Sequence, residues 1–239
     1  MEKQSATALS VKNLTVTLGN EKVLDNLSFE VATGESLAII GPNGAGKTML
    51  FRALIGVLSY KGKISWAPKT TIGYVPQKLD IERNLPLSLL DLLTSKNNHR
   101  HSITASLKLV RLKENLLNRP IGALSGGQFQ KALIAFALLQ DPRVLLFDEP
   151  TAGVDTPGEE HIYETIHRLQ EEKGFTILLI SHDLSLVYRY ADKVLCLNRE
   201  NLCFGEPEVI MAPEILGKLY GEERSFYKHH RHDIFPPIK

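Results

Sequence analysis

The sequence predicts an α/β fold with a mostly parallel core sheet. Three features carry this prediction: short apolar runs that alternate with helical patterns, a glycine-rich stretch between one such run and a helix, and a leucine-rich helical region in mid-chain. Parallel strands are covered by helices on both faces, so their sequences are almost continuously apolar. The 239 residues suffice for one large domain, or for one domain with an inserted lobe.

The first third of the chain is predicted to form strands around one glycine-rich loop. Residues 14–18 and 27–31 alternate apolar and polar side chains, which is the period of half-buried strands. A short apolar strand at Ser36–Ile40 runs directly into the glycine-rich stretch. Residues 63–67 and 71–75 are two further strand candidates.

The pattern changes in the middle of the chain. From about Lys78 to Ala123, leucine-rich helical segments alternate with polar breaks, which predicts an inserted helical lobe. Apolar strands return at Val144–Phe147 and Thr176–Ser181. Residues 193–207 predict a hairpin that turns near Arg199 and Glu200.

The helix between the last two apolar strands carries its own boundary signals. Thr156 with Glu159 fits a capping box, and Pro157 fits the first helical position. Gly174 fits the residue at which the helix ends.

Composition excludes several classes of protein. The net charge of +1 with 23% charged residues gives no broad basic field, so we expect no nucleic-acid partner. No apolar run approaches the roughly 20 residues that span a bilayer; the longest, Ala132–Leu139, fits a buried helix, and the polar N-terminus is no signal peptide. Cys196 and Cys203 make no disulfide framework. We expect small core residues in a reducing cytoplasm, or a thiol pair across the hairpin.

The stretch from Gly41 to Leu50, GPNGAGKTML, fits the phosphate-loop pattern G-x-x-x-x-G-K-S/T. Its glycines let successive backbone N–H groups point at one anion, and the following helix adds its dipole. Lys47 can reach the outer phosphates of a nucleotide, and the Thr48 hydroxyl can bind Mg²⁺. The predicted nucleotide contacts are Gly41, Pro42, Asn43, Gly44, Ala45, Gly46, Lys47, Thr48 and Met49.

Two carboxylates follow the strand at Val144–Phe147. Asp148 is expected to hold Mg²⁺, and Glu149 to polarise an attacking water as a general base. Taken alone, Asp-Glu-Pro could be only a polar strand exit. Its occurrence together with the phosphate loop favours the catalytic interpretation.

The stretch LSGGQ, Leu124 to Gln128, opens another predicted helix. Ser125 and Gln128 satisfy a capping box, so a purely local cap is one interpretation. A cap does not require the two glycines, Gly126 and Gly127. They open the backbone of a helix N-terminus, which predicts a second anion site.

With Gln77 in GYVPQ, Asp155 in AGVD and His182 in SHDL, these motifs make the chain similar to the ATP-binding-cassette ATPases over roughly residues 9–215. The resemblance implies a P-loop NTPase fold with an N-terminal antiparallel β-subdomain and an inserted α-helical subdomain at about 78–123. It implies an ATPase domain at 1–225, followed by a histidine-rich tail at 226–239.

The resemblance also implies ATP and Mg²⁺ as cofactors, and roles for single residues. Glu149, His182, Gln77 and Lys47 would be catalytic, and Thr48, Gln77 and Asp148 would hold the metal. Ser125, Gly126, Gly127, Gln128 and Asp155 of one copy would meet the nucleotide held by the other copy in a head-to-tail homodimer. His182 could instead be a strand-end histidine in ordinary hydrogen bonds.

The sequence departs from this family at two positions. Leu18, predicted to share a strand face with Leu14 and Val16, stands where many members stack an aromatic ring on adenine. Lys131 stands where arginine is frequent, so the planar fork of donors is lost. Trp66 is interpreted as a packing residue.

The sequence of the chain resembles the branch of the family that imports zinc, manganese or iron ions, and zinc is the first choice of cargo. Such a subunit lies on the cytoplasmic face of the membrane, bound to an integral membrane permease, and acts indirectly with an extracytoplasmic metal-binding protein. Residues 84–93 would offer an apolar groove to a permease helix, or simply pack in the lobe. The alternatives are import of another cargo such as an iron chelate, a non-transport ATPase of DNA maintenance or ribosomes, and a binding module without turnover.

Histidines near the end of the chain suggest one more site. The tail residues His229, His230, His232 and Asp233 suit zinc, and the lobe adds His99 and His101. These side chains could equally be solvated.

Overall fold

The structure is a computed structural model that describes residues 6–77 and 86–220. Among these residues, three strands form an N-terminal antiparallel sheet in the order β2-β1-β4. The strands are β1 (Thr7–Leu18), β2 (Glu21–Ala32) and β4 (Lys61–Trp66).

Six described strands form the central sheet, in the order β5-β6-β7-β3-β8-β9. Every neighbouring pair is parallel except β8 and β9. All residues of β3, β6 and β7 are buried, which is why their sequences are almost purely apolar. The predicted α/β class with a mostly parallel core sheet is confirmed. The strands are β3 (Ser36–Ile40), β5 (Ile72–Val75), β6 (Val144–Asp148), β7 (Thr176–Ile180), β8 (Lys193–Asn198) and β9 (Glu200–Gly205).

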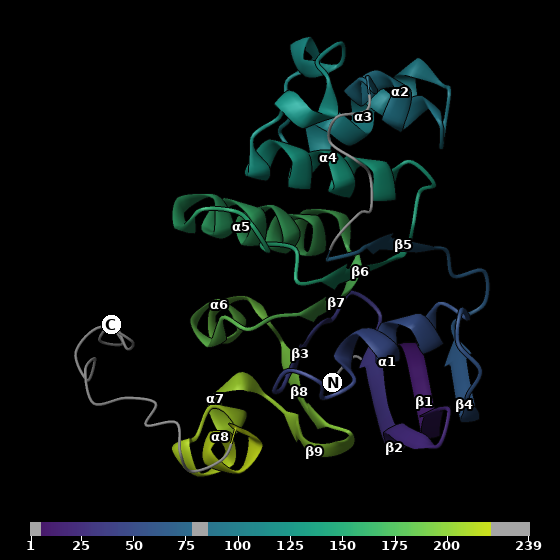
Figure 1. Ribbon diagram of the computed structural model, residues 1–239, viewed down its shortest axis with the longest axis vertical. Helices are drawn as coiled ribbons and strands as arrows, with labels where there is room; N and C mark the ends of the chain where they lie inside the picture. Colours follow the sequence, from purple (N-terminus) through teal and green to yellow (C-terminus); the bar gives the residue numbers. More distant parts are fainter. Residues whose placement is uncertain (1–5, 78–85, 221–239) are drawn as a thin grey trace.

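Helices cover the central sheet and extend from one end of it (Figure 1). In the view of Figure 1, α2, α3 and α4 lie together at the top, and α7 and α8 lie beside β9. The described helices are α1 (Lys47–Leu54), α2 (Leu89–Thr94), α3 (Arg100–Leu109), α4 (Gly126–Leu138), α5 (Thr156–Lys173), α6 (Leu184–Tyr190), α7 (Pro207–Ile210) and α8 (Pro213–Tyr220), with 3₁₀ turns at Glu114–Leu116 and Ile121–Ala123.

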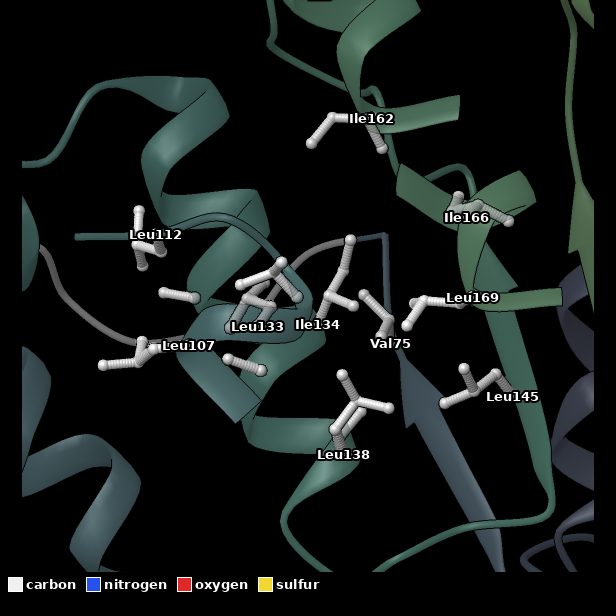
Figure 2. Close-up of a cluster of buried hydrophobic side chains, with 14 of the residues drawn as sticks. Val75, Leu107, Leu112, Leu133, Ile134, Leu138, Leu145, Ile162, Ile166 and Leu169 are labelled. Carbon is white, nitrogen blue, oxygen red and sulfur yellow. The ribbon is translucent and has the colours of Figure 1, made fainter. Parts of the chain in front are cut away.

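One apolar core joins the helices at the top to the sheet. Helix α4 contacts α2 and α3 on one side and α5 and β5 on the other. Its buried side chains therefore belong to a core that is shared by α2, α3 and the sheet. Figure 2 shows this cluster, which includes Leu107, Leu112, Leu133, Ile134, Leu138, Val75, Leu145, Ile162, Ile166 and Leu169.

The predicted capping box of α5 is wrong. The helix begins at Thr156, and its N-cap is Asp155, whose backbone carbonyl accepts the first helical hydrogen bond from Glu159 at 2.9 Å. Because Thr156 is already helical, Pro157 occupies the second helical position rather than the first. The predicted end at Gly174 is confirmed, with φ of 69° in the left-handed region that glycine adopts freely.

The two cysteines are core residues, as predicted, with Cys196 fully buried, and they also face each other across the hairpin, which was the alternative; the bridge between their sulfurs was not predicted. Antiparallel pairing of β8 with β9 places Cys196 directly opposite Cys203, with their Cα atoms 4.9 Å apart, and the sulfurs form a disulfide. That separation lies in the range that a disulfide can bridge. The hairpin itself turns between Asn198 and Glu200, as predicted.

Trp66 is a packing residue, as the sequence predicted. Its ring packs against the core between the two sheets, and its indole N–H donates to the Leu54 carbonyl at 3.1 Å. Within the described ranges, no helix is long and apolar enough to cross a bilayer.

Candidate nucleotide site

The glycine-rich loop connects the end of β3 to the start of α1. Its last glycine, Gly46, is the N-cap of α1 at φ of 95°, and no side chain caps the helix. A Cβ atom on Gly46 would lie 2.6 Å from a Leu24 methyl group and 2.8 Å from the Val23 carbonyl oxygen. Only glycine therefore fits here. The first N–H groups of α1 are left available to an anion.

Lys47 is a buried cation held by backbone oxygens. Only 7% of the residue is exposed, and its Nζ donates to the carbonyls of Gly41 at 2.8 Å and Pro42 at 3.0 Å. The ion pairs within residues 6–77 and 86–220 do not include it. Burial lowers the pKa of Lys47. An anionic phosphate at the loop would supply the missing counter-charge, so the donor set fits a nucleotide.

Asp148 meets the loop from the end of β6. Its Oδ1 accepts from the Thr48 hydroxyl at 3.2 Å, and its Oδ2 accepts from the Tyr74 hydroxyl at 3.2 Å. Burial, with 1% of the residue exposed, raises the pKa of Asp148, although both hydrogen bonds oppose the rise. Carboxylate and hydroxyl oxygens are the donors that Mg²⁺ prefers, so these side chains fit the metal.

Tyr74 was not among the residues that the sequence singled out. Burial and the neighbouring Asp148 raise its pKa to about 12, so it is a neutral donor at ordinary pH. The signal for it lies in the parallel pairing of β5 with β6, in which Tyr74 is opposite Leu146, two residues before Asp148. The two strands could be recognised from the sequence, but their pairing and its register could not.

Glu149 is held from two sides by residues of neighbouring loops. Gln77, after β5, donates from Nε2 to Glu149 Oε2, and His182, after β7, pairs through Nε2 with Glu149 Oε1. Glu149 itself has φ of 48°, a left-handed conformation that is uncommon for a residue with a side chain. Such strain is frequent where surrounding structure fixes a functional residue. The structure therefore brings together three side chains that are 72 and 33 residues apart in sequence.

A cavity of about 610 Å³ opens beside Glu149 and His182. Tyr163 and Ser181 lie in its wall and are hydrogen-bonded to each other. No sequence signal points to this pair, because Tyr163 lies within the long helix α5. Burial strongly raises the pKa of Tyr163, so its hydroxyl is neutral.

A second hollow, of about 880 Å³, lies over the start of α4. Its lining includes Ser125 to Gln128 and Asp155. The capping box is confirmed: Ser125 Oγ accepts from the Gln128 N–H at 3.2 Å, and the Gln128 side chain accepts from the Ser125 N–H at 3.1 Å. The lining of this hollow does not include Glu149 or His182, which line the 610 Å³ cavity, and Gly153 lines both.

Two further predictions concern Leu18 and the histidine-rich tail. Leu18 ends β1 with 44% of its surface exposed, whereas Leu14 and Val16 are fully buried, so the predicted shared face stops short of Leu18. An exposed aliphatic side chain is open to a ligand but cannot stack a ring. The tail residues His229, His230, His232 and Asp233 lie outside the described residues.

A glycine-lined loop before a helix, a buried lysine facing it and a strand-end aspartate bonded to the loop threonine define a nucleotide-binding domain of the P-loop class. The ABC transporter family matches residues 24–152, and the chain belongs to that family.

The comparisons add full-length similarity. The chain is 40% identical over 233 residues to the zinc import ATP-binding protein ZnuC of Pseudomonas putida, covering 96% of this chain and 90% of that protein. A solved ABC transporter assigned to the metal-chelate type, in an inward-facing conformation, is 29% identical with a TM-score of 0.81 over 89% of this chain and 88% of that one. The dimeric structure of a bacterial ABC transporter cassette is 26% identical with a TM-score of 0.71 over 83% of this chain and 98% of that one.

Replacing Asp148 by asparagine is expected to raise the melting temperature of the nucleotide-free protein at neutral pH. The folded protein binds the Asp148 proton more tightly than the unfolded chain does, because burial raises the pKa. Protonated Asp148 thus contributes fully to stability below the ordinary carboxyl pKa. This contribution is lost as pH rises through the raised pKa of Asp148. Thermal denaturation at neutral pH and at about pH 4 should show that the rise in melting temperature caused by Asp148→Asn is smaller at the lower pH. Exposed Glu172→Gln is the control; a lower melting temperature for Asp148→Asn at neutral pH would refute the assignment.

Proposed function

We propose that this chain is the ATP-hydrolysing subunit of a transporter that imports zinc through a separate membrane permease. The observation that carries the ATPase part is Glu149, held by Gln77 and His182 beside a phosphate loop. The zinc part is supported by the 40% identity to a zinc import ATP-binding protein over almost the whole chain.

The phosphate loop is proposed to bind the nucleotide through residues 41–49. Backbone N–H groups and the N-terminus of α1 contact the phosphates, and Lys47 leaves the carbonyls of Gly41 and Pro42 to neutralise them. Thr48, Asp148 and Gln77 are the proposed Mg²⁺ ligands, directly or through water. When bound, the metal neutralises charge that develops on the phosphates.

Glu149 is the proposed general base. Its carboxylate accepts the proton of the attacking water, and Gln77 fixes the orientation of that carboxylate through Oε2. His182 fixes Oε1 and is proposed to donate to the terminal phosphate. A positioned base of this kind typically contributes about 10²–10⁴-fold in rate.

A second copy of the chain is proposed to complete the site. A hollow whose lining does not include Glu149 is lined by Ser125, Gly126, Gly127, Gln128 and Asp155. In a head-to-tail pair, this surface would cover the nucleotide held by the other copy's loop. The dimeric cassette that shares this fold supports the arrangement. Loss of the terminal phosphate would then release the pair, so that hydrolysis drives a motion.

The permease is proposed to hold the chain at the cytoplasmic face of the membrane. Contact through residues 84–93 remains a proposal, because residues 78–85 lie outside the described part. The domain limits 1–225 and 226–239 likewise remain predictions.

The tail is proposed as a weak zinc site formed by His229, His230, His232 and Asp233. Calorimetric titration with zinc compares the intact chain with a form truncated after Phe226, and equal zinc binding by both would remove this idea.

Vesicles that contain the chain with its permease test the transport function. Addition of ATP is expected to drive accumulation of radioactive zinc in the presence of the extracytoplasmic binding protein, and Glu149→Gln should abolish it. Manganese, ferrous iron and an iron chelate are the competing cargoes. ATP-dependent accumulation of one of these without zinc would reassign the cargo, and no accumulation of any of them would contradict a role in import.

A further inference from the structure

Helix α8, the last helix of the described residues, lies against the strands that lead to the phosphate loop. Leu216 and Leu219 of α8 are 8% and 2% exposed and belong to one cluster with Ile40 of β3 and Cys196 of β8. Ile40 is the residue directly before Gly41. The helix is therefore fixed to the base of the loop.

The last residue of α8 reaches the loop itself. The backbone N–H of Gly41 donates a hydrogen bond to the Tyr220 hydroxyl. The Tyr220 ring packs against the same apolar cluster as Leu216 and Leu219. Burial raises the pKa of Tyr220, so its hydroxyl is neutral near physiological pH.

Gly41 is confined at its Cα atom and at its carbonyl as well as at its N–H. A Cβ atom on this residue would lie 2.0 Å from the Leu197 carbonyl oxygen, so the backbone is pressed against β8. Its own carbonyl accepts from Lys47 Nζ at 2.8 Å. Tyr220 and Lys47 thus bond to the two ends of one residue.

Tyr220 also lies beside the hydrolytic residues. It lines the 610 Å³ cavity that Glu149 and His182 line. The Tyr220 side chain of α8 therefore connects the first residue of the phosphate loop to the wall of that cavity.

We propose that Tyr220 is a positioning residue for the nucleotide, which acts by fixing Gly41, the first residue of the phosphate loop. The proposal rests on the ATPase function proposed above. A loop already held in its binding conformation loses less freedom when ligand binds, so the effect falls on nucleotide affinity. Tyr220 takes no part in bond making.

Tyr220→Phe is the test, because it removes the hydroxyl and keeps the ring in the apolar cluster. ATP hydrolysis is measured with the full chain bound to its permease, together with the melting temperature of the chain. We expect KM for ATP to rise about threefold to tenfold, which is the loss of one hydrogen bond, with kcat and melting temperature unchanged. Tyr60→Phe, the same change at a tyrosine that is 39% exposed, should alter none of the three.

Two outcomes would overturn the proposal while the wild-type protein hydrolyses ATP. One is an unchanged KM in Tyr220→Phe. The other is a lowered melting temperature with unchanged KM, which would make Tyr220 only a packing residue. Absence of hydrolysis by the wild-type complex would instead contradict the proposed function, so the two failures can be told apart.

Discussion

Replacing Glu149 by glutamine is expected to lower the rate of ATP hydrolysis by about 10²–10⁴-fold, the usual contribution of a positioned general base. Glutamine has nearly the same shape and can keep hydrogen bonds to Gln77 and His182, but it cannot accept the proton of water. ATP binding should be retained, because the side-chain hydrogen bonds of Glu149 go to Gln77 and His182 and not to the loop residues that are proposed to hold the phosphates. Steady-state phosphate release and equilibrium ATP binding check the two halves of this expectation.

The control for Glu149→Gln is Glu208→Gln, the same change at an exposed position of α7. It should leave hydrolysis and binding unchanged. A Glu149→Gln protein that hydrolyses ATP at the wild-type rate would remove Glu149 from its role, and the base would have to be sought elsewhere along the cavity.

Lys47→Met is expected to weaken ATP binding by about tenfold to a hundredfold, which is the range for a lost charge-assisted hydrogen bond. The same variant should leave the nucleotide-free protein equally stable or more stable. Burial lowers the pKa of Lys47, so the charged form costs stability when no phosphate is present. Methionine keeps most of the apolar stem. Calorimetric titration with ATP and thermal denaturation without it measure the two effects separately.

Lys61→Met is the matched control for Lys47, because Lys61 is exposed at the start of β4. It should change neither measurement. A large fall in the melting temperature of Lys47→Met without nucleotide would contradict this expectation. It would mean that the hydrogen bonds of Lys47 to the carbonyls of Gly41 and Pro42 stabilise the fold.

The strands that position the site could be predicted because burial on both faces demands an apolar sequence. The strand at Ser36–Ile40 was predicted to the residue, and the phosphate loop follows from a motif whose glycines have a steric reason, as at Gly46. The capping box at Ser125 was predictable for the same local reason. In each case the sequence signal lies within a few residues of chain, although the atoms that exclude a side chain at Gly46 belong to Val23 and Leu24.

Contacts between distant segments could not be predicted in the same way. Tyr74 reaches Asp148 because β5 pairs with β6 in one register, and Cys196 meets Cys203 because β8 and β9 do the same. Tyr220 meets Gly41 only after α8 has packed on β3 and β8. At Thr156 the local signal was misleading, because the N-cap of α5 is Asp155, one residue before the predicted N-cap.

The central claim is that two copies of the chain share each nucleotide, and a structure of the Glu149→Gln complex with its permease and ATP tests it most directly. The account predicts that Ser125 of one copy contacts the terminal phosphate of a nucleotide held by residues 41–49 of the other. A complex in which both loops hold ATP while Ser125 and its two glycines face solvent, away from any phosphate, would contradict it.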